Sequence, residues 1–373
     1  MKVALGLARR ALGTVAPNPA VGCVLVRQDQ GSSAGLPGRI VGRGHTMPGE
    51  RPHAETCALD AAGSLAKGAT AYVTLEPCAH HGKTPPCANA LIDAGIARVV
   101  VACTDPDPRV DGGGLKLLAK AGCEVVTSVC EQEALALNAG FFSTLTRDRP
   151  LVTIKTATTL DGRIATHTGE SQWITGEGAR ARGHLLRATH DAILVGSGTV
   201  RSDNPELTCR LPGMMDRSPI RVVLDGRLAT PLTSRLVATA HDHPTWIVTL
   251  AGLEPTRARV FEDAGVQLIT VDADEDGRPS LHQALRALKS RGVTRLLVEA
   301  GGRLDAGFFR ARLVDRVVWF HAPMIIGGDG IPAAQGFGID GLHQAPRLKR
   351  IDVQQVGPDL METYEVFPST EAE

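Results

Sequence analysis

Residues 53–57 read HAETC, and residues 75–87 read LEPCAHHGKTPPC. The two stretches bring one histidine, His53, and two cysteines, Cys78 and Cys87, into a short region of the chain. Imidazole nitrogen and thiolate sulfur are ligands that zinc prefers, and catalytic zinc sites use three protein ligands and leave the fourth position to water. The sequence therefore predicts a zinc site with one ion per chain.

Glu55, two residues after His53, favours a catalytic role for this metal. A carboxylate there can take a proton from an attacking water and return it to a leaving amine. An H-x-E triplet followed by P-C and a second cysteine is the signature of zinc deaminases, although their usual C-x-x-C spacing is shorter than PCAHHGKTPPC. Two alternatives stay open: a coincidental cluster, and a structural zinc whose fourth ligand is His80, His81 or Cys57.

The composition is that of an ordinary soluble globular protein. The 373 residues are 43% hydrophobic and 21% charged, and 40 basic residues balance 40 acidic ones, so no basic excess indicates nucleic-acid binding. No apolar run approaches the roughly 20 residues of a membrane span. Arginines interrupt the opening MKVALGLARRALG, which predicts an amphipathic helix rather than an export signal. We therefore expect a cytoplasmic protein with reduced cysteines, and we leave open whether it forms a homo-oligomer.

Strand and helix patterns alternate over residues 1–146, which predicts a sheet covered by helices. The expected strands are 20–26 and 39–44, paired as a hairpin, and then 69–75, 97–103 and 123–129. The expected helices are 53–65, 85–95, 114–122 and a single helix at 131–145.

A second α/β series occupies residues 147–373, so the length and the pattern predict two domains. Its expected strands are 151–157, 191–196, 220–226, 245–250, 266–271, 295–301, 348–356 and 360–367, with helices at 176–189, 280–291 and 302–312. No G-x-G-x-x-G fingerprint follows the first strand. Two glycine-rich turns, VGSGT (195–199) and EAGGRLDAG (299–307), instead lie between a strand and a helix, where backbone amides can bind phosphate.

Motifs along nearly the whole chain resemble the bifunctional deaminase/reductase family of riboflavin biosynthesis. They are PNPAVGC, HAE and TLEPCAHHGKTPPC in the first half, then KTATTLDG, GESQWIT, VGSGTVRSDNPELTCR and LVEAGGRL in the second. The resemblance implies a cytidine-deaminase-like α/β/α domain over 1–146 and a dihydrofolate-reductase-like α/β domain over 147–373. The family has several residues ahead of the stretch that matches MKVALGLARR, so we expect a shortened first helix.

By this resemblance, the first domain would remove the 2-amino group of 2,5-diamino-6-(5-phosphoribosylamino)pyrimidin-4(3H)-one. His53, Cys78 and Cys87 would hold the zinc that activates water, and Glu55 would carry the proton to the departing ammonia.

Three polar residues near these motifs have two interpretations each. Asn18, in PNPAVG, either binds the substrate or forms a turn between its two prolines. Lys83 and His81, between the cysteines, either meet the substrate phosphate or belong to a solvated loop.

The second domain would use NADPH to reduce the ribosyl side chain of 5-amino-6-(5-phosphoribosylamino)uracil to ribityl. By position in the motifs, the residues implied for NADPH are Ala157, Trp173, Thr199, Asp203, Gly301, Gly302, Arg303, Leu304, Asp305, Ala306 and Gly307. Those implied for the substrate are Ser171, Arg187, Leu207, Arg210 and Glu299.

Charged residues of the second domain suggest how that reaction is assisted. Arg187 and Arg210 can clamp a phosphate, because a guanidinium presents paired donors to a dianion. Lys155 stands on the first strand, where an unpaired ammonium is costly to bury, so we expect it to face a cleft and polarise the sugar. Glu299 or Asp203 would be its partner.

Two other functions deserve comparison. One is a zinc deaminase of nucleosides or tRNA fused to an NADPH reductase of different specificity. The other is an inactive, zinc-stabilised binding protein. The wide gap between the cysteines and the balanced charge argue against tRNA, and the presence of Glu55 beside three ligands argues against an inactive protein.

Overall fold

The computed structural model describes residues 1–28, 38–49, 51–79, 85–107 and 112–367. The chain divides into two compact units, unit 1 (Met1–Asp148) and unit 2 (Arg149–Glu373); the sequence had predicted a boundary between residues 146 and 147. Within the described residues, no helix is both long and apolar enough to cross a membrane.

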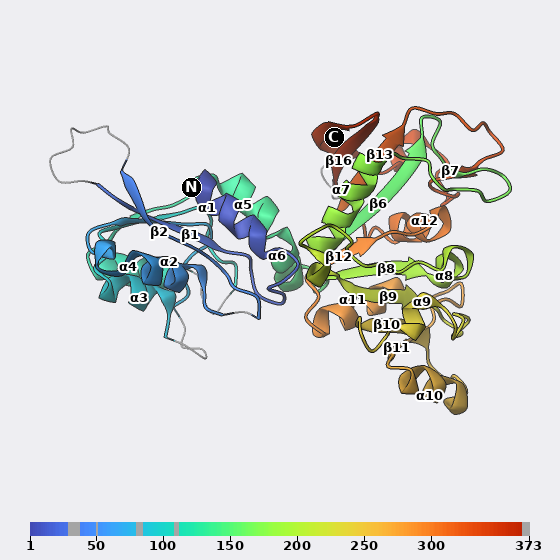
Figure 1. Ribbon diagram of the computed structural model, residues 1–373, viewed down its shortest axis with the longest axis horizontal. Coiled ribbons are helices and arrows are strands. Elements are labelled where there is room, and N and C mark those ends of the chain that lie inside the picture. Colours follow the sequence, from blue (N-terminus) through green and yellow to red (C-terminus); the bar gives the residue numbers. More distant parts are fainter. Residues whose placement is uncertain (29–37, 50, 80–84, 108–111, 368–373) are drawn as a thin grey trace. The chain divides into compact units, whose positions relative to one another are not determined.

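Unit 1 is built on a five-stranded sheet in the order β2-β1-β3-β4-β5 (Figure 1). β1 is antiparallel to both β2 and β3, whereas β3, β4 and β5 are parallel to one another. The strands are β1 (Gly22–Arg27), β2 (Arg39–His45), β3 (Thr70–Val73), β4 (Arg98–Val101) and β5 (Glu124–Val126). The α-helices are α1 (Lys2–Ala8), α2 (Ala54–Ala62), α3 (Cys87–Asp93), α4 (Gly113–Lys120), α5 (Glu131–Leu137) and α6 (Ala139–Thr146), and short 3₁₀ turns follow α1 (Arg9–Ala11) and α2 (Gly63–Ala66).

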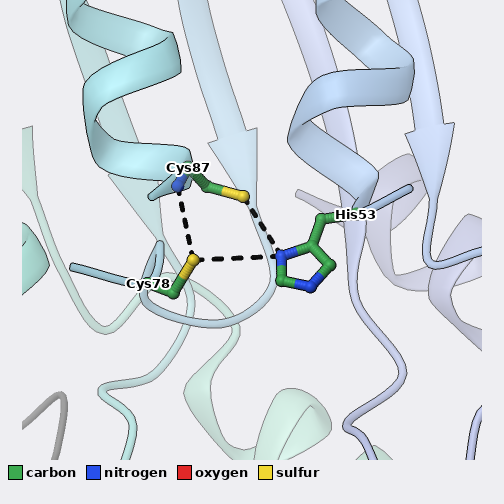
Figure 2. A group of neighbouring side chains, drawn as sticks. All are labelled: His53, Cys78 and Cys87. Atoms are coloured by element: carbon green, nitrogen blue, oxygen red, sulfur yellow. Dashed lines mark hydrogen bonds between the residues drawn. The ribbon is translucent and has the colours of Figure 1, made fainter. Parts of the chain in front are cut away.

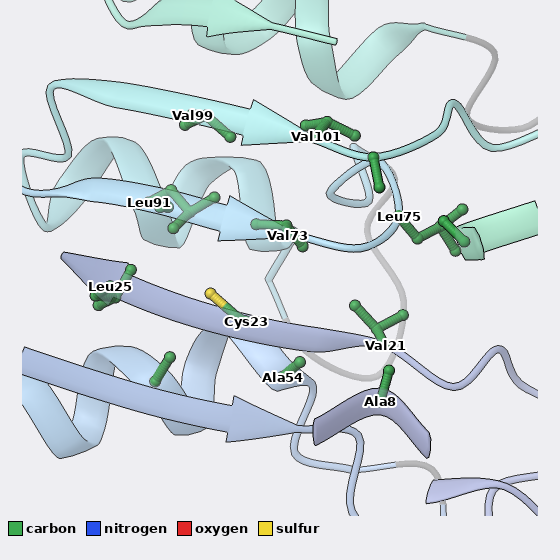
Figure 3. Close-up of a cluster of buried hydrophobic side chains, with 14 of the residues drawn as sticks. Ala8, Val21, Cys23, Leu25, Ala54, Val73, Leu75, Leu91, Val99 and Val101 are labelled. Atoms are coloured by element: carbon green, nitrogen blue, oxygen red, sulfur yellow. The ribbon is translucent and has the colours of Figure 1, made fainter. Parts of the chain in front are cut away.

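The core of unit 1 follows from the alternation of side chains along its strands. The register places Cys23 of β1 opposite Val73 of β3, and Val73 beside Val101 of β4, so that one face of the sheet presents a continuous apolar row. All three side chains are fully buried, together with Leu91 of α3 (Figure 3). The predicted hairpin and the three following strands are therefore confirmed.

Two glycines bring helix α2 into direct contact with strand β2. A β-carbon added at Gly42 would lie 2.1 Å from the carbonyl oxygen of Ala58, and one added at Gly44 would lie 2.1 Å from that of Ala54. Any other residue at either position would push the helix away from the sheet. The two glycines thus fix the position of α2, whose first turn follows His53.

The prediction of a single helix at 131–145 is wrong. The helix breaks at Asn138, whose backbone (φ −95°, ψ 14°) leaves the helical range between α5 and α6. The Asn138 side chain instead forms two hydrogen bonds with the backbone of Ala20. Cys57, on helix α2, is only half-buried.

Unit 2 has a nine-stranded sheet in the order β11-β10-β9-β8-β12-β6-β13-β16-β15 (Figure 1). The strands from β11 to β13 are parallel, and β16 and β15 complete one edge antiparallel. The strands are β6 (Leu151–Thr159), β8 (Ala192–Gly196), β9 (Ile220–Leu224), β10 (Thr245–Leu250), β11 (Gln267–Val271), β12 (Arg295–Val298), β13 (Arg316–Ala322), β15 (Leu348–Val356) and β16 (Asp359–Val366). A separate ribbon pairs β7 (Arg163–Ala165) with β14 (Ile331–Pro332).

Helices cover both faces of this sheet. The apolar cluster on one face includes α11 (Leu281–Ser290) and α12 (Gly302–Arg310). Clusters on the other face include α7 (Glu177–Ala188), α8 (Ser197–Asp203), α9 (Arg235–Ala238) and α10 (Pro255–Asp263). In such parallel sheets ligands bind beyond the carboxyl ends of the strands.

Both glycine-rich turns of the sequence lie at this carboxyl edge. β8 runs directly into α8, and β12 is followed by Gly301 and the start of α12, while β12 lies between β8 and β6. A β-carbon at Gly302 would lie 2.6 Å from the carbonyl oxygen of Pro332, so glycine is required for this close approach. The predicted strand–turn–helix arrangement is confirmed at both turns.

Candidate functional site

His53, Cys78 and Cys87 form a compact three-ligand cluster in unit 1 (Figure 2). The His53 Nδ1 atom lies 3.2 Å from Cys87 Sγ and 3.9 Å from Cys78 Sγ. Tetrahedral zinc, with bonds of about 2.0 Å to nitrogen and 2.3 Å to sulfur, separates its ligand atoms by roughly 3.5 to 3.8 Å. The donor set and its spacing therefore fit zinc.

Three different elements bring these ligands together. His53 is the residue before α2, Cys87 is the first residue of α3, and Cys78 follows the end of β3. The backbone N–H of Cys87 donates to Cys78 Sγ at 3.3 Å, and the N–H of Ala88 donates to the Cys78 carbonyl at 3.2 Å. The two free amides at the start of α3 thus hold the Cys78 loop against the helix.

The two cysteine side chains influence each other's ionisation. The hydrogen bond from Cys87 lowers the pKa of Cys78 to about 4, and the same bond raises the pKa of Cys87. One thiolate is therefore available at neutral pH, and a divalent cation would favour the second because a ligating thiol is deprotonated.

Glu55 is 4% exposed and lies in the first turn of α2. Burial, followed by the negative charge of Cys78, raises the pKa of Glu55 to about 7. A carboxyl with a pKa near neutrality can both accept and donate a proton, which is what a general acid–base group requires.

A pocket opens beside this cluster. It contains four residues that the sequence had singled out, namely Asn18, His53, Glu55 and Cys78. It is also lined by residues that the sequence interpretation missed: Pro19, Val21, Thr46, Arg51, Leu75, Glu76, Asp105, Asp107 and Phe141. Glu76, Asp105 and Asp107 follow the adjacent parallel strands β3 and β4, and this common carboxyl edge was the signal that could have identified them. The alternatives at His80, His81 and Lys83 lie outside the described residues, and Cys57 is not a member of the cluster.

Buried side chains hold the pocket wall that carries Asn18. The Ala20 N–H donates to Asn138 Oδ1 at 2.9 Å, and Asn138 Nδ2 donates to the Ala20 carbonyl at 3.1 Å. The Val21 N–H donates to the Thr46 hydroxyl at 3.0 Å. Three positions after Asn138, Phe141 lines the same pocket, so one asparagine orders two parts of its wall.

Replacing Asn138 by alanine is expected to destabilise unit 1 by about 2 kcal/mol, because two buried backbone groups of Ala20 lose their partners. The KM of the unit 1 reaction should also rise, because the segment that carries Asn18 is held less firmly in the pocket wall. Thermal unfolding and steady-state kinetics measure the two effects. The neighbouring Leu137→Ala variant is the control: it removes core packing and leaves both Ala20 bonds, so a KM increase in both variants alike would contradict this role.

In unit 2, the residues implied for NADPH, apart from Trp173, lie on or directly after three adjacent strands. Ala157 is on β6, Thr199 and Asp203 are on α8 after β8, and the 301–307 stretch forms the start of α12 after β12. The end of β8 lies close to α12, since a β-carbon at Gly196 would lie 3.7 Å from Leu304 Cδ2. Asp305 is 2% exposed, its Oδ1 has no hydrogen-bond partner among the described residues, and burial raises its pKa.

Arg187 and Glu299 form a buried ion pair. The Nε and Nη2 atoms of Arg187 donate to the two carboxylate oxygens at 2.8 and 2.9 Å, and Nη1 donates to the Thr208 carbonyl at 3.0 Å. Burial opposes ionisation of Glu299, but the Arg187 guanidinium outweighs it and lowers the pKa of Glu299 to about 2. Arg187 therefore joins the end of β12 to the 207–210 segment.

The remaining predicted residues differ in exposure. Arg210 is half-exposed and pairs with Glu206 at 3.1 Å, while Leu207 beside it is buried. The Lys155 ammonium lies 5.7 Å from the centre of the Phe320 ring. Ser171 and Trp173 lie in the segment before α7; the Trp173 side chain is 64% exposed, and the guanidinium of Arg180 covers its ring at 4.6 Å.

Comparison with known proteins assigns both units to known families. The family model of the cytidine and deoxycytidylate deaminase zinc-binding region matches residues 1–103, and the model of the RibD C-terminal domain matches residues 150–361. The riboflavin biosynthesis protein RibD of Bacillus amyloliquefaciens is 41% identical over 361 residues, covering 96% of this chain and 94% of that protein. The chain belongs to the RibD family.

Solved RibD structures agree with this assignment over the whole chain. Acinetobacter baumannii RibD superposes with a TM-score of 0.85 at 36% identity, covering 98% of each chain. The diaminohydroxyphosphoribosylaminopyrimidine deaminase/5-amino-6-(5-phosphoribosylamino)uracil reductase of Thermotoga maritima superposes with a TM-score of 0.83 at 34% identity, covering 98% of this chain and 97% of that one. The expected fold class, a cytidine-deaminase-like domain followed by an α/β reductase domain, is confirmed, and the second domain, expected to resemble dihydrofolate reductase, is a RibD reductase domain.

As a RibD protein, the chain is a bifunctional enzyme, a zinc-dependent deaminase and a reductase of riboflavin biosynthesis. The three-ligand cluster and Glu55 lie in the deaminase region, and the two glycine-rich turns lie in the reductase region. The interpretation as an inactive zinc-stabilised protein is therefore wrong.

Proposed function

We propose that unit 1 hydrolyses the amino group at C2 of 2,5-diamino-6-(5-phosphoribosylamino)pyrimidin-4(3H)-one. The observation that carries the proposal is Glu55, buried at one pocket with His53 and Cys78. Zinc bound there supplies a Lewis acid that lowers the pKa of water. Glu55 accepts a proton from the attacking water and gives it to the amino nitrogen, which leaves as ammonia while a carbonyl forms at C2.

The polar pocket residues orient the pyrimidine in this proposal. Asn18 presents amide donor and acceptor groups from a wall that Asn138 and Thr46 hold in place. Asp105 and Asp107, which follow β4, line the same pocket. Their carboxylates can accept hydrogen bonds from the amino groups on the pyrimidine ring.

We propose that unit 2 then reduces the ribosyl side chain of 5-amino-6-(5-phosphoribosylamino)uracil, with NADPH as the hydride donor to C1′ of the opened sugar. Ala157, Thr199 and the amides at the start of α12 would bind NADPH, because the carboxyl edge of β8, β12 and β6 exposes helix N-termini suited to its phosphates. Trp173 and Asp203 are the more exposed cofactor contacts.

The substrate side of this second site centres on the Arg187–Glu299 pair. Because Glu299 engages two donors of Arg187, the more exposed Arg210 is the better cation for the substrate phosphate. Leu207 and Ser171 would complete the contacts. Lys155 would polarise the opening sugar; its charge acts on Glu299, although Glu299 pairs directly with Arg187.

Lys155→Ala should lower the turnover of the reductase by about 10²-fold, because polarisation of the sugar matters mainly in the transition state. NADPH oxidation under saturating substrate measures this effect. Deamination by the same protein is the internal control and should be unchanged; an unaltered reductase kcat would remove Lys155 from the reaction.

The proposed function is tested by incubating the purified protein with the diaminopyrimidine phosphoriboside. Ammonia release without NADPH, followed by NADPH oxidation only after deamination, is the expected result. No ammonia from this substrate would refute the first activity, and no oxidation with the deaminated product would refute the second. We place the enzyme in the cytoplasm, where a reducing environment keeps its eight cysteines from forming disulfides.

A further inference from the structure

The deaminase pocket has an uneven distribution of charge. Four carboxyl groups line it, from Glu55, Glu76, Asp105 and Asp107, whereas Arg51 is the only lysine or arginine among its described lining residues. Negative groups in a confined site raise the energy of an incoming anion. Among the described lining residues, a substrate phosphate therefore has one cation to meet.

Two of the four carboxyl groups accept backbone N–H groups of unit 1. Glu76 accepts the backbone N–H groups of Asp105, Gly114 and Leu115 at 3.3, 3.0 and 3.3 Å. Asp105 accepts the N–H of Asp107 at 3.0 Å. Arg51, in contrast, has no ion pair or hydrogen bond to any residue that the structure describes. Its charge is available to a ligand.

Arg51 is also suitably placed. It lies two residues before His53, in a segment closed by the hydrogen bond from the Met47 N–H to the Pro52 carbonyl at 3.2 Å. Its side chain is half-buried, whereas Glu55 is almost fully buried. The reactive C2 atom must lie at the metal ligands, so the phosphoribosyl group at C6 extends away from them.

We propose that Arg51 binds the 5′-phosphate of the deaminase substrate and makes this site selective for phosphorylated pyrimidine ribosides. The inference rests on the proposed function of unit 1 and adds its anchor for the phosphate. A guanidinium suits this role because it offers paired donors in a planar fork to two phosphate oxygens. Neutral Asn18 and Thr46 share the pocket and do not repel the dianion.

The test compares Arg51→Gln with the unchanged protein on two substrates, the diaminopyrimidine phosphoriboside and the same riboside without phosphate. For the phosphorylated substrate, KM should rise about 10- to 100-fold with little change in kcat, as expected for loss of a charge-assisted hydrogen bond. For the unphosphorylated substrate, the two proteins should have similar KM values. Arg51→Lys should recover part of the affinity because it restores the charge.

Two controls separate this effect from general electrostatics and from damage to the metal centre. Arg43→Gln removes an exposed cation of β2 that does not line the pocket, and it should leave KM unchanged. Zinc content should be equal in all variants. An equal KM increase for both substrates, or no increase for either, would overturn the assignment of Arg51.

Binding of ribose 5-phosphate distinguishes this proposal from the proposed function. Calorimetry should show a weaker or absent interaction in the Arg51→Gln variant than in the unchanged protein. If the unchanged protein releases no ammonia from the phosphoriboside, the proposed function fails, while the calorimetric difference still decides the role of Arg51. Identical ribose 5-phosphate binding in both proteins would sink the Arg51 proposal alone.

Discussion

Cys87→Ser is expected to abolish deamination and to remove zinc, while reductase activity remains. Serine oxygen is a much poorer zinc ligand than thiolate sulfur, and only His53 and Cys78 would be left. Cys87 and the reductase residues belong to separate compact units, so reduction of the deaminated product should continue. Metal analysis, ammonia release and NADPH oxidation on the same preparation measure the three outcomes.

Cys57→Ser provides the matched control. Cys57 lies in the same helix as Glu55 but outside the ligand cluster, so this variant should keep zinc and deamination. Loss of zinc from Cys57→Ser would support a fourth protein ligand and hence a structural ion. Full zinc content and turnover in Cys87→Ser would contradict the ligand assignment.

Glu55→Gln should keep the zinc and the fold while deamination falls by roughly 10² to 10⁴, the range for loss of a general acid–base group. Glutamine has nearly the same shape, but its amide cannot accept the proton of the attacking water. The variant should still bind substrate, because the metal ligands and the Asn18 wall are unchanged. Single-turnover ammonia release measures the chemical step directly.

Glu76→Gln tests whether any buried carboxyl in this pocket matters equally. The Glu76 carboxylate accepts three backbone N–H groups, at Asp105, Gly114 and Leu115. Loss of its charge should therefore lower the unfolding temperature, an effect that Glu55→Gln should not share. Unchanged turnover in Glu55→Gln would exclude Glu55 from proton transfer.

The local patterns of unit 1 could be predicted from sequence because they depend on near neighbours. The apolar runs that contain Cys23, Val73 and Val101 predicted the strands, and the spacing of His53, Cys78 and Cys87 predicted the metal cluster. The break at Asn138 could not be predicted in this way. This break depends on hydrogen bonds to the backbone of Ala20, 118 residues away in the sequence. The pattern of apolar residues within 131–145 carries no information about so distant a partner.

The site of unit 2 shows the same limit for charged residues. Glu299 belonged to a recognisable motif and Arg187 lay between two of them, but their mutual pairing depends on how α7 packs beside the end of β12. Arg51 had no motif at all, and its position in the pocket follows from the segment before α2. Composition and spacing identify which groups are present; the tertiary packing decides which of them neutralise one another.

The Asn138–Ala20 hydrogen bonds bear on when the enzyme acquires activity during its own synthesis. All three metal ligands have been synthesised once the ribosome has passed Cys87. The pocket wall beside Asn18, however, lacks its hydrogen bonds to Asn138 until residue 138 has been added and α6 has formed. Closing a contact between such distant residues is slow compared with forming a helix. A nascent chain therefore holds all its zinc ligands before it can order the wall beside Asn18, and full affinity for the pyrimidine comes only with the last helices of unit 1.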